Sequence, residues 1–245
     1  MTQDRTIDDT SRKPTQGKGT PSYWQTACKQ LAEADPVMAR LIAAHHNDVL
    51  QGSGDALQTL VNAVVGQQIS VHAAESIWKR FQALVPEMTP PALAAADSDA
   101  LRQTGLSYRK VEYVQGIAHA FLDGTLDTIL DGHHLNTLDD SQVRQKLCSI
   151  RGVGPWTADM FLIFYLKRPD VLPTGDLGLV NAAVRLYGLK ESKKSDNAAG
   201  CDGAGKLSEP DKKESVIRLA EQWRPWRTVA TWYIWRDLDA KPVLY

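Results

Sequence analysis

The chain has little cysteine and no long apolar run. Its three cysteines, Cys28, Cys148 and Cys201, lie far apart with no Cys-x-x-Cys spacing, so neither a zinc site nor a disulfide framework is indicated. No stretch approaches the roughly twenty consecutive apolar residues of a membrane-spanning helix, and no secretory signal begins the chain. We therefore expect a protein that makes no contact with a membrane.

A strong excess of one charge is also absent, because the formal net charge is −1. This value argues against a strongly basic nucleic-acid coat, although phosphate contact needs only a local basic face. Such a face is available over 144–168, where Asp159 is opposed by Arg144, Lys146, Arg151, Lys167 and Arg168. An ordinary solvated surface is the alternative interpretation. The six histidines lack the accompanying ligand spacing of a metal site, so none is predicted.

Sustained polar–apolar alternation is missing too, and nothing in the sequence demands a sheet. Apolar residues recur instead at helical spacing, which predicts an all-α fold. Residues 1–20 are polar and are expected to form a disordered tail, and the hydrophilic stretch 190–213 is expected to be a mobile loop. The predicted helices span 22–34, 36–46, 55–65, 70–84, 98–104, 108–122, 140–150, 155–167, 177–187, 214–223 and 226–238.

What the chain does contain is a glycine hairpin between two of these helices, LCSIRGVGPWTA over 147–158. Gly152 supplies a residue that is free to take positive φ, as a helix stop requires. Gly154 and Pro155 then open the next helix, since proline is tolerated at the first helical position. The unpaired N–H groups at that helix start favour an anion. The hairpin thus predicts a phosphate grip, with an ordinary helix–turn–helix corner as the alternative.

A single carboxylate, Asp176, follows the hairpin within the segment Leu172-Pro-Thr-Gly-Asp-Leu177. An aspartate at a helix start is most often an N-cap. Beside a phosphate grip it also fits an enzyme that acts on nucleic acid. The two roles are compatible.

Particular motifs that occur in order along the chain give it a family resemblance: Gly66-Gln-Gln-Ile-Ser70, the hairpin, Gly175-Asp-Leu-Gly178 and Trp223-Arg-Pro-Trp-Arg227. Together they resemble the helix-hairpin-helix DNA glycosylase superfamily, in its 3-methyladenine DNA glycosylase II (alkylation-repair) branch. The resemblance covers roughly 22–240. It implies two helical lobes with the active-site cleft between them, a central lobe over 55–170 and a second lobe from 21–54 plus 171–245.

The resemblance also assigns roles to residues of the cleft. An enzyme that acts on a base within a duplex must flip the nucleotide out, and Gln68 stands where relatives place the residue that enters the duplex. Gln67 and Gln68 could instead hydrogen-bond the bases left behind. Asp176 is the expected catalytic residue, which stabilises the positive charge that develops on the sugar and orients water. The backbone and side chains expected to hold DNA phosphates belong to Arg151, Gly152, Val153, Gly154 and Thr157.

The base pocket implied by the resemblance is aromatic. Trp156 and Trp235 would line it, with Met160 where some relatives carry tyrosine, and an indole face attracts a cationic alkylated base. Trp223, Trp226 and Trp232 are expected to pack the C-terminal lobe. No cofactor or metal is required, although the resemblance allows a monovalent cation at the backbone of Arg151 and Gly154.

The missing residue types refine the activity. Relatives that also cut the DNA strand place a lysine where this chain has Trp156. Three cysteines are also too few for the four-cysteine iron–sulfur cluster of endonuclease III-like and adenine glycosylases. We therefore expect a monofunctional glycosylase that releases 3-methyladenine or 7-methylguanine from damaged double-stranded DNA in base excision repair. The alternatives are another lesion (hypoxanthine, etheno adducts or uracil) or a non-enzymatic DNA-binding module. The expected state is a monomer, in the cytoplasm with the nucleoid in a prokaryote and in the nucleus in a eukaryote.

Overall fold

The computed structural model describes residues 19–130, 138–189 and 207–238. Within these ranges every regular element is a helix, which confirms the all-α prediction. The elements are α1 (Trp24–Ala34), α2 (Pro36–Ala44), α3 (Ala56–Gly66), α4 (Val71–Leu84), α5 (Pro90–Ala94), α6 (Ser98–Gln103), α7 (Tyr108–Leu122), α8 (Asp127–Leu130), α10 (Asp140–Cys148), α11 (Pro155–Met160), η1 (Phe161–Tyr165), α12 (Leu177–Tyr187), α13 (Glu209–Leu219), η2 (Ala220–Trp223) and α14 (Arg227–Leu238).

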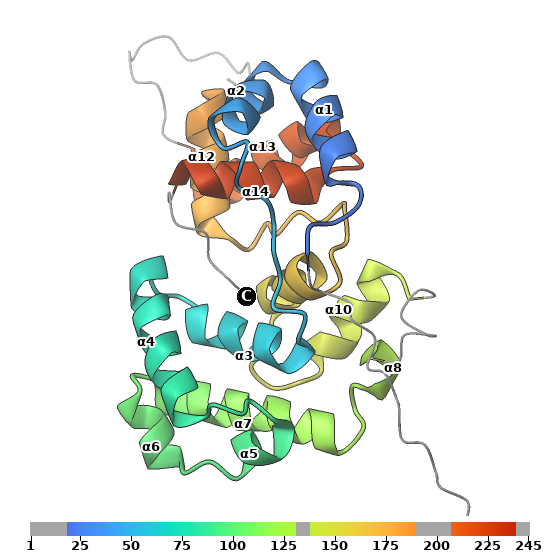
Figure 1. Cartoon of the computed structure of the whole chain (residues 1–245). Coiled ribbons are helices and arrows are strands. Elements are labelled where there is room, and N and C mark those ends of the chain that lie inside the picture. Colours follow the sequence, from blue (N-terminus) through green and yellow to red (C-terminus); the bar gives the residue numbers. More distant parts are fainter. Residues whose placement is uncertain (1–18, 131–137, 190–206, 239–245) are drawn as a thin grey trace, which may run out of the picture.

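The helices gather into two groups (Figure 1). The upper group contains α1, α2, α12, α13 and α14, and the lower group contains α3 to α8 together with α10. Each group is built around one helix that is buried on almost all sides, α3 below and α14 above. The lobe boundaries predicted from the sequence, near 54 and 170, stay a prediction.

The predicted helix over 155–167 is interrupted. It begins as α11 and continues as the π-helical turn η1, in which the N–H of Leu166 donates to the carbonyl of Phe161 at 3.0 Å. Such wide turns are rare and concentrate at functional sites. All five residues of the turn are buried, and helical periodicity alone does not predict the interruption.

Three further differences concern short or weakly patterned segments. The helix expected over 214–223 begins earlier, because Ser208 caps α13 at Glu209 and η2 follows it. The expected mobile loop therefore ends before residue 209, and its part over 190–206 lies outside the described residues, as does most of the predicted tail. The helices α5 and α8, which were not predicted, have only five and four residues.

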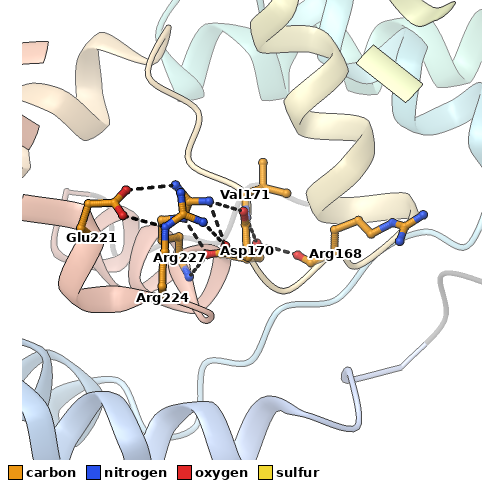
Figure 2. A network of polar contacts seen from close by, with 7 residues as sticks. Arg168, Asp170, Val171, Glu221, Arg224 and Arg227 are labelled. Carbon is orange, nitrogen blue, oxygen red and sulfur yellow. Dashed lines mark hydrogen bonds and ion pairs between the residues drawn. The ribbon is translucent and has the colours of Figure 1, made fainter. Parts of the chain in front are cut away.

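The segment that leads from the lower group to the upper one is fastened to α14 (Figure 2). Asp170 accepts hydrogen bonds from Arg227 Nε at 2.6 Å and from Arg224 Nη1 at 2.8 Å. The hydroxyl of Thr228 donates to the carbonyl of Arg168 and accepts from the N–H of Val171. Asp176 follows this anchored segment by a few residues along the chain.

Candidate active site

The hairpin joins α10 to α11 through a tight turn in which Gly152 has a φ of +91°. A Cβ atom at this position would lie 2.1 Å from Cγ of Tyr113. Glycine is required here for two reasons. The backbone has a positive φ, and the ring of Tyr113 fills the space that a side chain would need. The tyrosine ring, rather than a phosphate, occupies the side-chain position of Gly152.

Gly154, in contrast, has an open side-chain position. It is the N-cap of α11 with φ −95° and ψ 179°, and a Cβ atom there would meet nothing within 4 Å. Since Pro155 has no N–H, the backbone N–H groups of Trp156 and Thr157 are the ones that a helix start leaves without intrahelical acceptors. Of the predicted phosphate contacts, those of the backbone around Gly154 have the space they need.

The side chains of the hairpin differ from the expected set. Val153 and Thr157 are buried, with exposed fractions of 4% and 1%, so their side chains face the protein. Arg151 has a side-chain exposure of 78% and forms a 3.0 Å ion pair with Glu112. The guanidinium of Arg151 is thus the accessible charged group of the hairpin.

The Gln67–Gln68 loop is locked to the hairpin. Nε2 of Gln67 donates to the carbonyl of Gly152 at 2.9 Å and to Oγ1 of Thr157 at 2.8 Å. Nζ of Lys110 donates to the carbonyls of Val65 and Gln67 at 2.7 and 2.8 Å, and burial lowers the pKa of this lysine. The side-chain amide nitrogen of Gln67 therefore binds the hairpin, and not the duplex as predicted from the sequence.

Gln68 follows in a left-handed conformation with φ 57° and is exposed. A non-glycine residue with positive φ is uncommon and is held by its surroundings. Here the surroundings are the Gln67 and Lys110 contacts just described. Of the two predicted wedge residues, Gln68 is the one whose side chain is accessible.

Asp176 uses its two carboxylate oxygens for different partners. Oδ1 accepts from the N–H of Leu179 at 2.8 Å and so caps α12, while Oδ2 accepts from Nε1 of Trp156 at 3.1 Å. The side chain is neither buried nor fully exposed. The two roles inferred from the sequence, capping and chemistry, are sterically compatible because a carboxylate accepts up to about four hydrogen bonds.

Two cavities meet at Asp176. The larger, about 1080 Å³, runs along the Gln67–Gln68 loop, Lys110, the hairpin and Trp156. The smaller, about 290 Å³, extends to α14 in the upper group of helices. Asp176 and Trp156 line both cavities. This arrangement places the carboxylate where an elongated space beside the hairpin joins a side pocket.

The side pocket is strongly aromatic, with Trp156, Phe164, Trp232 and Trp235 in its wall. The rings of Phe164 and Trp235 are stacked, with centroids 6.1 Å apart and planes 8° apart. Trp232 is 1% exposed and belongs to the core as well as to the wall. Trp156 and Trp235 thus lie where a base pocket was predicted.

Met160 is a correction to that prediction. Its exposed fraction is 1% and it is absent from the described residues that line either cavity. It ends α11 just before the π turn and faces the core. The pocket residue that this helix contributes beyond Trp156 is Phe164, which belongs to the π turn.

Other residues of the site were missed by sequence reasoning. Lys110 and Tyr113 hold the loop and the hairpin from α7, and Arg236 lines the side pocket from the last turn of α14. A lysine and a tyrosine three residues apart, and an arginine in a tryptophan-rich helix, do not by themselves indicate a functional site. The roles of Lys110 and Tyr113 depend on contacts with segments that are distant in the chain, the Gln67–Gln68 loop and the hairpin.

No group of three or more histidine, cysteine, aspartate or glutamate side chains that could hold a metal occurs in the described part of the chain. The carbonyl of Gly154 accepts from the N–H of Ala158 at 3.0 Å and keeps a second lone pair, so a monovalent cation at the hairpin stays a prediction. Over the same described ranges, no helix is long and apolar enough to cross a membrane.

The fold and the hairpin define a class of protein. The model of the HhH-GPD superfamily of base excision DNA repair proteins matches residues 61–199, which include the loop, the hairpin and Asp176. The chain belongs to this superfamily.

Within this superfamily, the chain is similar to DNA-3-methyladenine glycosylases. The chain is 27% identical over 202 residues to DNA-3-methyladenine glycosylase 1 of Schizosaccharomyces pombe, covering 81% of this chain and 79% of the relative. It is 29% identical over 209 residues to DNA-3-methyladenine glycosylase 2 of Escherichia coli, covering 81% of this chain and 63% of the relative.

Solved structures agree. The S. pombe 3-methyladenine DNA glycosylase in complex with abasic DNA superposes with a TM-score of 0.70 at 26% identity, covering 89% of this chain and all of that one (100%). A DNA-3-methyladenine glycosidase from Bacillus halodurans gives a TM-score of 0.62 at 32% identity, covering 87% and 89% of the two chains.

Proposed function

We propose that this protein is a monofunctional DNA glycosylase that flips an alkylated base out of duplex DNA and hydrolyses its N-glycosidic bond in base excision repair. The observation that carries the proposal is the place of Asp176, which lies at the junction of the two cavities with Trp156 as its hydrogen-bond partner. The large cavity suits the sugar and phosphates along the hairpin, and the aromatic pocket suits the base. The named activities of the relatives support the same reaction.

The chemistry follows from the charge that forms. As the bond between C1′ and the base nitrogen breaks, its electron pair goes to the base and the sugar becomes an oxocarbenium-like cation. A fixed carboxylate beside C1′ stabilises that cation. Water then adds to C1′, and Asp176 orients it and accepts its proton before passing the proton to solvent.

The aromatic pocket explains a preference for alkylated bases. Methylation at N3 of adenine or N7 of guanine leaves the base with a positive charge and makes it a good leaving group. Stacking between indole rings attracts such a cation by about 1–2 kcal/mol when water is excluded. Trp156 and Trp235 are the rings we assign to this contact, and Gln68 is the residue we assign to the space vacated in the duplex.

The grip on DNA is proposed to use the backbone N–H groups after Gly154 and the exposed Arg151 and Arg109, which lies on the rim of the large cavity. Phosphate contacts position a duplex without reading its sequence. The protein would act as a monomer on damaged double-stranded DNA, in the nucleoid or the nucleus.

We also propose that the enzyme leaves the abasic strand intact. A strand-cutting glycosylase needs an amine that attacks C1′, and Trp156 occupies the position where relatives of that kind carry lysine. Lys110 is the lysine among the described residues that line the large cavity, and its Nζ is bonded to two backbone carbonyls. Borohydride treatment during the reaction should trap no covalent complex, and a complex that disappears in Lys110→Met would contradict this.

The reaction is tested by measuring the release of free bases from methylated duplex DNA with the intact protein and with Asp176→Asn. Asparagine caps a helix as well as aspartate does, so the variant should fold and bind DNA. We expect release of 3-methyladenine and 7-methylguanine to fall by about a hundredfold or more in the variant. No release by the folded intact protein would overturn the proposal, and equal release by both proteins would remove Asp176 from it.

A further inference from the structure

Lys110 lies where its charge does not suit its own helix. It is in the first turn of α7, and the positive end of the helix dipole disfavours a cation there. Its Nζ instead reaches the C-terminal end of α3, where it donates to the carbonyls of Val65 and Gln67 at 2.7 and 2.8 Å. Carbonyls at this end of a helix have no intrahelical donors and favour a cation. The lysine is therefore placed to hold the end of a helix other than its own.

The end of α3 leads directly into the loop that carries Gln68. Only residues 67–70 separate α3 from α4. Gln67 is held on two sides, since Lys110 binds its carbonyl and its Nε2 donates to the hairpin. At the other end of the loop, the hydroxyl of Ser70 caps α4. Between these two fixed points Gln68 has a φ of 57° and an exposed side chain.

A residue that enters a duplex has to keep its position against stacked bases. Extruding a nucleotide costs the energy of unpairing and unstacking, and a loop ordered before it binds DNA does not add the cost of its own ordering. The left-handed backbone of Gln68 is uncommon for a residue with a side chain, so it depends on neighbouring contacts. Lys110 supplies two charge-assisted hydrogen bonds, which are stronger than neutral ones.

We propose that Lys110 is a positioning residue for base flipping, which acts through the backbone of Gln67 to keep Gln68 in the conformation that enters the duplex. The inference rests on the proposed glycosylase reaction and on the place assigned there to Gln68. Two of the three N–H donors of Lys110 are used by the backbone. Because Lys110 also lines the large cavity, the competing role for it is a direct contact with a DNA phosphate.

The test compares single-turnover release of 7-methylguanine from two duplexes. In the first, the damaged base is paired with cytosine. In the second, it lies opposite an abasic-site analogue, where no base pair has to be broken and a wedge contributes less. In Lys110→Met we expect the rate on the paired lesion to fall by about tenfold, and the rate on the unpaired lesion by less than about threefold. Lys110→Arg, which keeps the charge and the donors, should recover most of the paired rate.

Gln68→Ala and Arg109→Met are the matched controls. Gln68→Ala should reproduce the pattern of Lys110→Met. The double variant should be no slower on the paired lesion than the slower single variant, because both changes remove the same function. Arg109→Met removes a neighbouring exposed charge from the wall of the same cavity and should weaken the binding of both duplexes equally.

Other outcomes decide against the proposal. An equal fall on both duplexes in Lys110→Met would mean that the lysine contacts phosphate or supports the fold. Effects of Lys110→Met and Gln68→Ala that add would mean that the lysine does not act through Gln68. If Lys110→Met does not fold, Lys110→Gln replaces it in every comparison, and failure of both to fold would assign the lysine to stability. These results overturn the inference alone, whereas no release from either duplex by the intact protein overturns the proposed function.

Discussion

Asp35 and Asp176 both cap the N-terminus of a helix, but their wider surroundings differ. Asp35 caps α2 by accepting from the N–H groups of Val37 and Met38, and Asp176 caps α12 by accepting from that of Leu179. Each also accepts from a tryptophan indole, Asp35 from Trp223 and Asp176 from Trp156. Neither local sequence nor capping geometry separates them.

The other contacts of Asp35 and Asp176 do distinguish the two residues. Asp35 is 4% exposed and also accepts from the hydroxyl of Tyr187 at 2.6 Å and from Nε2 of Gln222 at 3.1 Å. Burial, followed by the contact with Asp35, raises the pKa of Tyr187, so this hydroxyl remains a donor. Protein donors surround Asp35, while Asp176 faces two cavities. The comparison teaches that two aspartates with the same local contacts can differ in how much hydrogen-bonding capacity the fold leaves open to a cavity, and this difference supports the catalytic role proposed for Asp176.

The largest expected effect in this comparison is on stability at Asp35. In Asp35→Asn an amide replaces the oxygen that accepts from Tyr187, Gln222 and Trp223, so buried donors lose their acceptor. We expect the free energy of unfolding to fall by about 3 kcal/mol or more, as measured by urea denaturation. Base release per folded molecule should be unchanged. Asp176→Asn is the matched control, in which we expect base release to fall and stability to be kept. An equal loss of stability in both variants would contradict the distinction between the two aspartates.

The two hairpin glycines offer a second comparison of this kind, because the side-chain position of Gly152 is filled by the protein and that of Gly154 is open. In Gly152→Ala the new Cβ would overlap the Tyr113 ring and the backbone would keep a positive φ. We expect a loss of about 2–3 kcal/mol in the free energy of unfolding, seen as a lower midpoint in thermal unfolding.

Gly154→Ala is the control for that variant, because its Cβ would enter open space. Stability should change by less than about 1 kcal/mol, while affinity for duplex DNA should fall by about tenfold as a hydrogen bond to phosphate is weakened. Fluorescence anisotropy with a labelled duplex measures the change. Unaltered affinity would mean that phosphate does not approach the backbone at Gly154.

The smallest effect is expected from the indole donors. Trp156→Phe removes the N–H that orients Oδ2 of Asp176 and keeps an aromatic ring in the pocket wall. We expect the single-turnover rate to fall by about fivefold, in line with a net hydrogen-bond contribution of about 1 kcal/mol. Trp223→Phe removes the equivalent donor from Asp35 and should lower stability without changing that rate. A reduced rate in Trp223→Phe would show that the two carboxylates are coupled through the upper group of helices.

Much of the site could be predicted from the sequence because its parts are local. The helix stop at Gly152, the helix start at Gly154 and Pro155, and the cap at Asp176 each depend on residues within one turn of chain. The structure has each of them at the predicted place. The helical segments were predictable for the same reason, apart from short helices such as α5, which show too few apolar repeats.

Contacts between distant segments could not be predicted. Three features depend on packing between helices. They are the burial of Thr157 and Met160, the hydrogen bonds of Gln67 to the hairpin, and the π turn that follows α11. The periodicity of 155–167 is that of a single helix. That periodicity does not predict the π turn, and in the structure Phe164 of that turn, rather than Met160, lies in the pocket wall.

The sequence by itself determined the all-helical class, the hairpin and the motifs by which the family is recognised, because these depend on neighbouring residues. Tertiary structure alone decided which aspartate is buried and surrounded by protein donors and which one opens onto a cavity. It also decided that Arg236 joins the pocket wall. The physical reason is that burial and hydrogen-bond partners are set by segments far apart in the chain, and these quantities turn a charged residue into a structural or a functional one.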